Sequence, residues 1–254
     1  MRQRITALFL SASLAAFGAA PSLTIYTEVN APLQFQDEHG QLTGLAVEVV
    51  QEIQKRTGGT EPIQLVPWAR GYLELEALPN IVLFATARTA ERNPLFKWVG
   101  PFDETIFSLY VRADSRIHLK SLEEAKGLRA IGVYKNDVRD LHLTKAGFKN
   151  LDRTINNVAN VKKLMAGRID AFASASVSIE ELTHSAGYKP EDVREAIPFM
   201  KVQQFIAFSK GTPDSTVSAW ANAFQTMKKD RTFEQIFRKY YPNRPLPGPA
   251  ITTF

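Results

Sequence analysis

The chain has 254 residues, and its 31 Lys and Arg against 26 Asp and Glu give a formal charge of +5. The basic residues form no stripe interleaved with aromatic residues, so nucleic-acid binding is not expected. The absence of cysteine excludes disulfides and thiolate chemistry. The length fits one large domain or two small lobes.

The N-terminus has the features of a secretory signal peptide. Arg2 and Arg4 supply the positive start, residues 5–17 are uncharged and mainly apolar, and residues 18–20 are small. This apolar segment is too short to span a bilayer as an ordinary helix. Removal of residues 1–20 would leave 29 basic against 26 acidic residues, a net charge of +3. Without a cysteine for a lipid anchor, we expect an unanchored periplasmic protein.

The next part of the chain alternates between predicted strands and a predicted helix. Residues 23–27, 63–66 and 81–85 are β-branched or apolar runs typical of strands. In residues 44–57 apolar side chains recur every fourth position, which predicts a helix ended by Gly58. Strands alternating with helices indicate an α/β fold.

The alternation of predicted strands and helices begins again near Arg112. The predicted elements are a short helix capped by Ser121 and Glu124, a strand at 128–134, a helix at 157–166 and a strand at 169–173. A strand at 201–209 then returns the chain to the first unit, where helices at 214–228 and 232–240 pack. The Pro-rich tail from residue 242 is predicted to be loop or disorder.

Five short motifs occur in order along the chain. They are Gly40-x-x-x-Gly44, Thr89-x-x-Arg92, Trp98-Val-Gly-Pro-Phe102, Gly132-Val133 and Ala166-Gly-Arg-Ile-Asp170-Ala. Together they resemble the bacterial periplasmic solute-binding proteins of family 3, which deliver polar amino acids to ABC importers. The resemblance covers residues 23–241.

The resemblance implies a fold and a division of the chain. The fold is the two-lobed α/β type II fold of periplasmic binding proteins, with a ligand cleft between the lobes. Lobe one would contain residues 21–111 and 203–241, and lobe two residues 112–202, followed by the tail at 242–254. Closure would occur by a hinge at the crossing strands.

Arg92 is the first candidate ligand-binding residue. A guanidinium is a planar fork that matches a carboxylate, and in similar receptors this Arg holds the ligand α-carboxylate. Arg92 also comes shortly after a buried strand, where we expect a helix to begin. The free N–H groups at the start of that helix would attract an anion. The alternative is a surface arginine paired with Glu91 or Asp103.

Other candidates follow strand ends, where ligands of open α/β sheets bind. Arg88 follows the strand at 81–87, and Arg70 follows the strand that ends at Trp68; either could instead pair with Glu74, Glu76 or Glu91. Among the aromatic residues, Tyr26, Trp68 and Tyr134 are predicted walls of the cleft, with Trp68 as the stacking surface. Trp98 and Phe102 are predicted to lie in the core.

Three positions depart from the family pattern. Ala175 replaces an acid that neutralises the ligand ammonium, with Ser174 beside it; Ala87 replaces a small hydroxyl residue; and Asn136-Asp137 replaces a Gly-Thr or Gly-Ser turn. An unpaired buried ammonium is costly. Either Asp137 or Glu28 therefore binds the cation, or the ligand is not an ordinary α-amino acid.

The functional prediction is a monomeric substrate-binding protein of an ABC importer that binds a small carboxylate-bearing solute and docks on a membrane permease. No catalytic motif is present, the four histidines lack metal-ligand spacing, and no cofactor is expected. The alternatives are a dehydratase acting on prephenate-like acids, with Glu28 or Asp137 as acid or base, and a partner of a membrane sensor.

Overall fold

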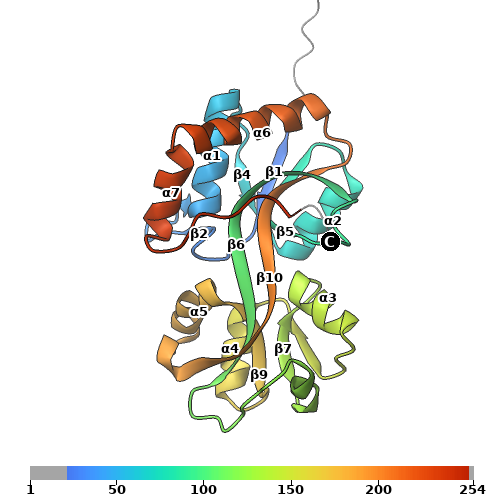
Figure 1. Ribbon diagram of the computed structural model, residues 1–254, viewed down its shortest axis with the longest axis vertical. Helices are drawn as coiled ribbons and strands as arrows, with labels where there is room; N and C mark the ends of the chain where they lie inside the picture. The colour runs from blue at the N-terminus through green and yellow to red at the C-terminus, as the bar shows by residue number, and fades with distance from the viewer. Residues whose placement is uncertain (1–21, 252–254) are drawn as a thin grey trace, which may run out of the picture.

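Two α/β lobes are connected by two long antiparallel strands (Figure 1). The structure is a computed structural model that describes residues 22–251, so the predicted signal peptide at 1–20 lies outside the described residues. The connecting strands are β6 (Phe96–Arg112) and β10 (Val193–Ser209). They pair along most of their length, from Val193 opposite Arg112 to Ser209 opposite Phe96. Both lobes therefore belong to one eight-stranded sheet, with strand order β4-β1-β5-β10-β6-β9-β7-β8.

Lobe one is built on the parallel strands β1, β4 and β5, with β10 antiparallel beside β5. Its strands are β1 (Thr24–Thr27), β4 (Ile63–Leu65) and β5 (Ile81–Arg88), and a small separate hairpin is formed by β2 (Phe35–Gln36) and β3 (Leu42–Thr43). Its helices are α1 (Leu45–Thr57), α2 (Trp68–Ala77), α6 (Asp214–Lys229) and α7 (Thr232–Tyr240).

The two faces of this sheet are covered by different helices. Ile25 and Phe84 face a core made with α1, α6 and α7, whereas Tyr26 and Leu83 face α2. This follows from the alternation of side chains along a strand. The two-sided cover explains the nearly continuous apolar sequence of β5.

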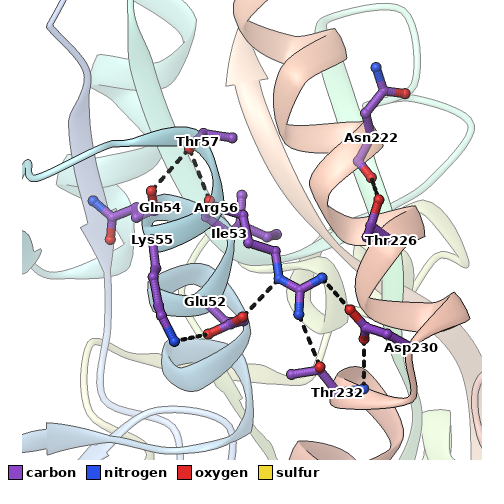
Figure 2. Close-up of polar contacts among 10 residues, drawn as sticks. All are labelled: Glu52, Ile53, Gln54, Lys55, Arg56, Thr57, Asn222, Thr226, Asp230 and Thr232. Atoms are coloured by element: carbon purple, nitrogen blue, oxygen red, sulfur yellow. Dashed lines mark hydrogen bonds and ion pairs between the residues drawn. The ribbon is translucent and has the colours of Figure 1, made fainter.

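Lobe one is also held together by polar contacts between α1 and the junction of α6 with α7 (Figure 2). Arg56 donates to Glu52 at 2.7 Å, to Asp230 at 2.7 Å and to Thr232 at 2.9 Å. Asp230 caps the end of α6 and Thr232 begins α7. One guanidinium thus joins residues that are more than 170 positions apart in the sequence.

Lobe two repeats the α/β arrangement. Its strands are β7 (Ile131–Tyr134), β8 (Leu151–Thr154) and β9 (Ala171–Ala175), and its helices are α3 (Val138–Lys145), α4 (Asn157–Met165) and α5 (Ile179–Ala186), with 3-10 turns at Glu123–Gly127, Ser176–Ser178 and Pro190–Asp192. β7 runs parallel to β8 and β9. β9 pairs with β6 between Phe107 and Tyr110, which attaches the lobe to the crossing strands.

Most elements agree with the sequence prediction, with shifts at the ends. The helix predicted at 232–240 is confirmed, α1 ends at the left-handed Gly58, and the left-handed Gly167 follows the C-cap Ala166 of α4. The predicted helix near Ser121 is a single 3-10 turn, in which the Glu124 carboxylate accepts from Lys120 N rather than from Ser121 N. The strand predicted at 201–209 begins earlier, at Val193.

The C-terminal tail lies against the crossing strands (Figure 1). Residues 242–251 have no regular secondary structure, as predicted, but they are bound to lobe one. Arg244 donates to Asp103 at 3.0 Å, and Gln203 is bonded to Pro249 O at 2.9 Å and to Ile251 N at 2.8 Å. Within the described residues, no helix is long and apolar enough to cross a membrane.

Candidate ligand-binding cleft

The two lobes touch each other across the cleft. The Trp68 indole of lobe one donates to the backbone carbonyl of Asn136 of lobe two at 3.4 Å. Lys145 of α3 forms a 2.6 Å ion pair with Glu91. The Ser178 hydroxyl donates to Ala31 O at 3.0 Å. These contacts join the lobes at three places, so the cleft is closed.

Arg92 is buried inside this closed cleft, with 3% of its surface exposed. Its guanidinium carbon lies 5.2 Å from the ring centre of Trp68 and 5.0 Å from that of Tyr72. Both rings belong to α2, so one helix supplies two aromatic faces to the cation. Its Nη1 donates to Ala87 O at 3.3 Å.

The rest of the Arg92 guanidinium is incompletely paired. Nη2 is buried and has no hydrogen-bond partner among the described residues. Burial lowers the pKa of Arg92 from its ordinary value, and the nearby Tyr72 and Asp137 oppose that shift. A buried donor without an acceptor is destabilising. A ligand carboxylate at this position would supply the missing acceptor.

The Thr89-x-x-Arg92 motif has a local structural cause. The Thr89 hydroxyl accepts from Arg92 N at 3.3 Å, and Asn93 N donates to Thr89 O at 2.8 Å. These bonds form a turn directly after β5. The expectation that a helix begins here is wrong, because the chain turns straight into β6. Arg92 therefore acts through its side chain, without a helix N-terminus beside it.

The other two predicted arginines lie in different environments. Arg88, at the end of β5, donates to Asn93 Oδ1 at 2.8 and 2.6 Å and packs against the rings of Trp98 and Phe205. Burial lowers the pKa of Arg88. Arg70 is exposed in the first turn of α2 and pairs with Glu74 at 2.9 Å. This is the alternative pairing considered for Arg70 from the sequence.

The predicted aromatic walls separate into two groups. Trp68 stacks on Arg92, but it begins helix α2 instead of ending a strand. Tyr26 is buried beneath α2 and donates to Glu74 at 2.6 Å, so it belongs to the core of lobe one. Phe102 is fully buried, as predicted, and Trp98 is partly buried against the same core as Tyr26.

Two cavities open between the lobes. The arginine cavity, of about 610 Å³, contains Arg88 and Arg92 and extends along α3 to β10 and the tail. The glutamate cavity, of about 460 Å³, contains Glu28, Tyr134 and Arg139. No described residue lines both cavities.

Arg139 is a charged residue of the cleft that the sequence analysis missed. It is 7% exposed and forms an ion pair with Asp137, to which its Nε donates at 2.5 Å. Its guanidinium lies 5.2 Å from the Phe107 ring and 5.9 Å from the Tyr134 ring. Burial raises the pKa of Glu28 to about 7, although Arg139 and the Tyr134 hydroxyl oppose the shift.

Asn136 and Asp137 have a structural role at the start of α3. Asn136 takes a left-handed conformation with φ 61°, and its N donates to Asp140 at 2.9 Å. Asp137 caps the helix by accepting from Arg139 N at 2.9 Å and Asp140 N at 3.2 Å. The sequence analysis missed this helix, although an Asn-Asp pair before Val138 is a typical start signal.

The remaining predicted positions are small and buried. Ser174 is 1% exposed in β9, and its hydroxyl donates to Ala175 O at 3.5 Å. Ala87 contributes its backbone carbonyl to Arg92. Among residues 22–251, no group of three or more His, Cys, Asp or Glu side chains is arranged to hold a metal ion.

Comparison with known proteins identifies the family of the chain. The family model of bacterial extracellular solute-binding proteins, family 3, matches residues 23–243. The chain belongs to this family. A curated relative is the L-cystine-binding protein TcyJ of Escherichia coli K12, 22% identical over 212 residues, which cover 83% of this chain and 78% of that protein.

Solved structures of similar fold come from several kinds of protein. A histidine kinase sensor domain aligns with a TM-score of 0.78 and 18% identity, over 89% of this chain and 99% of the domain. The arginine-, lysine-, histidine-binding protein ArtJ of Geobacillus stearothermophilus aligns with a TM-score of 0.76 and 16% identity, over 89% of this chain and 97% of that chain. At these identities the likeness shows the two-lobed fold.

Proposed function

We propose that this family 3 member is the periplasmic solute receptor of an ABC importer, and that it binds a small carboxylate-bearing ligand between its lobes. The observation that carries the proposal is the buried Arg92 guanidinium, which is stacked on aromatic rings and has an unpartnered Nη2 inside the cleft. The protein keeps a desolvated cation there at a cost in stability. A bound anion would offset that cost.

Capture would be coupled to closure of the lobes. Besides β6 and β10, the lobes are joined by the three polar contacts described above and by apolar packing. Ala87 shares an apolar cluster with Val138, and Tyr134 packs against the core of Tyr26. A bound carboxylate would add interactions that exist only when both lobes surround it, and would shift the population toward the closed form. The closed monomer would then dock on a membrane permease.

The test compares solute binding by the intact protein and by an arginine variant. Protein purified from a periplasmic extract is denatured, and the released small molecules are identified by mass spectrometry. Titration of refolded protein with the released solute measures its affinity. Arg92→Ala is expected to weaken binding by about 2–5 kcal/mol, as for truncation of a buried charged partner.

Arg112→Ala is the matched control. Its guanidinium is exposed, donates to the neighbouring Asp114 at 2.9 Å, and lies at the far end of β6. Equal affinities of the Arg92 and Arg112 variants would contradict the proposed anchor. Export to the periplasm is tested by fractionation, and the importer by co-purification with a permease.

A second candidate is an enzyme that uses Glu28 as an acid or base. Burial raises its pKa to about 7, and it lines a cavity beside Tyr134 and Arg139. A carboxyl group that titrates near neutral pH is suited to proton transfer. Aromatic product formed from a prephenate-like acid, and lost in Glu28→Gln, would support the enzyme; a solute recovered unchanged after incubation would support the receptor.

A further inference from the structure

We infer that the ligand held by Arg92 is a carboxylate with an apolar body and without an ammonium group. This inference rests on the proposed receptor function and concerns the class of ligand. Three observations support it. The walls of the arginine cavity are mainly apolar, most of its charged lining residues are basic, and the nearby acids are paired or lie outside the cavity.

The walls of the arginine cavity are mainly apolar. Tyr72 and Leu95 come from lobe one, Val138 and Leu141 from α3, and Met200 and Val202 from β10. The cavity of about 610 Å³ is of the size that accommodates a small organic molecule. An aliphatic or aromatic group would bury apolar surface against these side chains, at about 25 cal/mol per Å².

The charged groups that line the cavity are almost all cationic. They are Arg88, Arg92, Lys145 and Lys201, of which Lys201 is paired with Glu104 at 2.8 Å. His142 also lines the cavity, but burial lowers its pKa and favours the neutral ring. Glu91 is the single carboxylate among the described lining residues, and it is paired with Lys145 at 2.6 Å. The Lys145 ammonium lowers the pKa of Glu91 to about 2. This field attracts an anion and repels a ligand ammonium.

Asp137 and Glu76 interact with the Arg92 charge, but neither lines the arginine cavity. Both carboxylate oxygens of Asp137 accept hydrogen bonds, one from the backbone of α3 and the other from the Arg139 side chain. Glu28 lines the glutamate cavity, which shares no described lining residue with the arginine cavity. None of these acids lines the cavity in which the ligand would lie.

Lobe two also carries a cation beside Ala175. Phe107 pairs with Ala175 in the sheet, and the Arg139 guanidinium lies over the Phe107 ring at 5.2 Å. Arg139 Nη1 donates to Ala173 O at 3.5 Å. Ala175 stands where the family pattern has an acid for the ammonium. In this chain the nearby guanidinium is paired with Asp137, so this place offers no free carboxylate to a ligand ammonium.

The experiment uses pairs of compounds that differ in the α-ammonium group. Protein stripped of solute by unfolding and refolding is titrated calorimetrically with 3-phenylpropanoate and L-phenylalanine, 4-methylpentanoate and L-leucine, and glutarate and L-glutamate. We expect the first member of each apolar pair to bind at least about tenfold more tightly than the amino acid. We also expect both apolar acids to exceed glutarate.

Two variants at an exposed position of the cavity make the test specific. Leu141 is 50% exposed, so substitution there should leave the fold intact. Leu141→Glu adds a carboxylate to the lining and should raise the affinity for L-phenylalanine relative to 3-phenylpropanoate. Leu141→Gln, of equal size without the charge, should weaken the binding of both compounds alike, because it removes an apolar wall without adding a carboxylate.

The outcomes separate the inference from the proposed function. If amino acids bind as tightly as their amine-free partners and lose affinity in Arg92→Ala, the receptor function stands and the inference is overturned. The inference is also overturned if none of the six compounds binds, or if glutarate binds best. If the solute released from the native protein binds equally well to Arg92→Ala, the proposed anchor fails independently.

Discussion

The indole of Trp68 donates a hydrogen bond to the backbone carbonyl of Asn136, and this contact connects the two lobes directly over Arg92. Trp68 therefore has two roles: its ring stacks on the guanidinium, and its N–H holds the opposite lobe. In the proposed receptor, ligand binding and lobe closure would share this side chain. A substitution that keeps the ring and removes the N–H separates the stacking on Arg92 from the hydrogen bond to Asn136.

Trp68→Phe keeps an aromatic ring near Arg92 and removes the donor to Asn136. The loss of one hydrogen bond, roughly 0.5–1.5 kcal/mol, should shift the ligand-free protein toward the open form. Small-angle X-ray scattering would then show a larger radius of gyration. Trp98→Phe is the matched control, because Trp98 donates to Asn93 O within lobe one at 3.2 Å. An unchanged scattering profile in Trp68→Phe would show that this contact does not hold the lobes together.

Glu28 should make the protein less stable as the pH rises. Burial raises the pKa of Glu28 from 4.5 to about 7, so the folded state retains a proton that the unfolded chain releases. The free energy of unfolding should therefore decrease between pH 4.5 and about 7, by on the order of 1–3 kcal/mol. Below pH 4.5 the carboxyl is protonated in both the folded and the unfolded state, so it contributes nothing to the pH dependence of stability.

Glu28→Gln should remove this part of the pH dependence. The measurement is urea unfolding of both proteins at several pH values, with Glu38→Gln, in an exposed turn of the same lobe, as the control. Parallel stability curves for Glu28→Gln and the original protein would contradict the raised pKa. The groups around Glu28 that influence the result are Arg139, Asp137 and Tyr134.

Arg244 should stabilise the crossing strands from the tail. Asp103 in β6 is fully buried, accepts from Arg244 and Thr105, and has a pKa that burial raises to about 6. Arg244→Ala would leave that carboxylate without its cation and should lower the free energy of unfolding by about 3 kcal/mol. Thermal or chemical denaturation at pH 7.5 measures the loss.

A substitution of Asp103 tests whether its unpaired charge causes the loss of stability in Arg244→Ala. Asp103→Asn in the Arg244→Ala background should restore part of the stability, because it removes the unpaired charge. Lys201→Ala, which removes a partly exposed pair with Glu104, should cost less than about 1 kcal/mol. If the double variant were no more stable than Arg244→Ala, the charge of Asp103 would not explain the effect.

Gly44, at the start of α1, should tolerate no side chain. It has φ 124°, and a Cβ there would lie 2.4 Å from Leu33 O. Gly44→Ala should lower the free energy of unfolding by about 2 kcal/mol or more, because the backbone of residues 33 and 34 must move. Gly40→Ala adds a Cβ at positive φ with nothing within 4 Å, and should cost only about 1 kcal/mol. Equal costs would show that backbone conformation, and not the clash, decides the effect.

Local patterns predicted the regular elements that have strong signals. The period of four in α1, its glycine stop and the apolar runs of β1 and β5 depend on nearby residues, so they were visible in the sequence. Helices α2, α3 and α5 were missed. In α3 the buried residues include Arg139 and Asp140, so its buried face is not apolar in the sequence. The N-cap Asp137 was the available signal for α3, but it was interpreted as a ligand-binding residue.

The sequence by itself determined the family and the α/β order of the elements and marked Arg92 as a candidate anchor, because motifs and periodicity are properties of neighbouring residues. Only the tertiary structure decided which charges meet in the cleft. Arg70 lies outside with Glu74, while Arg139 is buried beside Asp137. Such pairings depend on how separate elements pack and how much water they exclude, and this is set by contacts between residues distant in the chain.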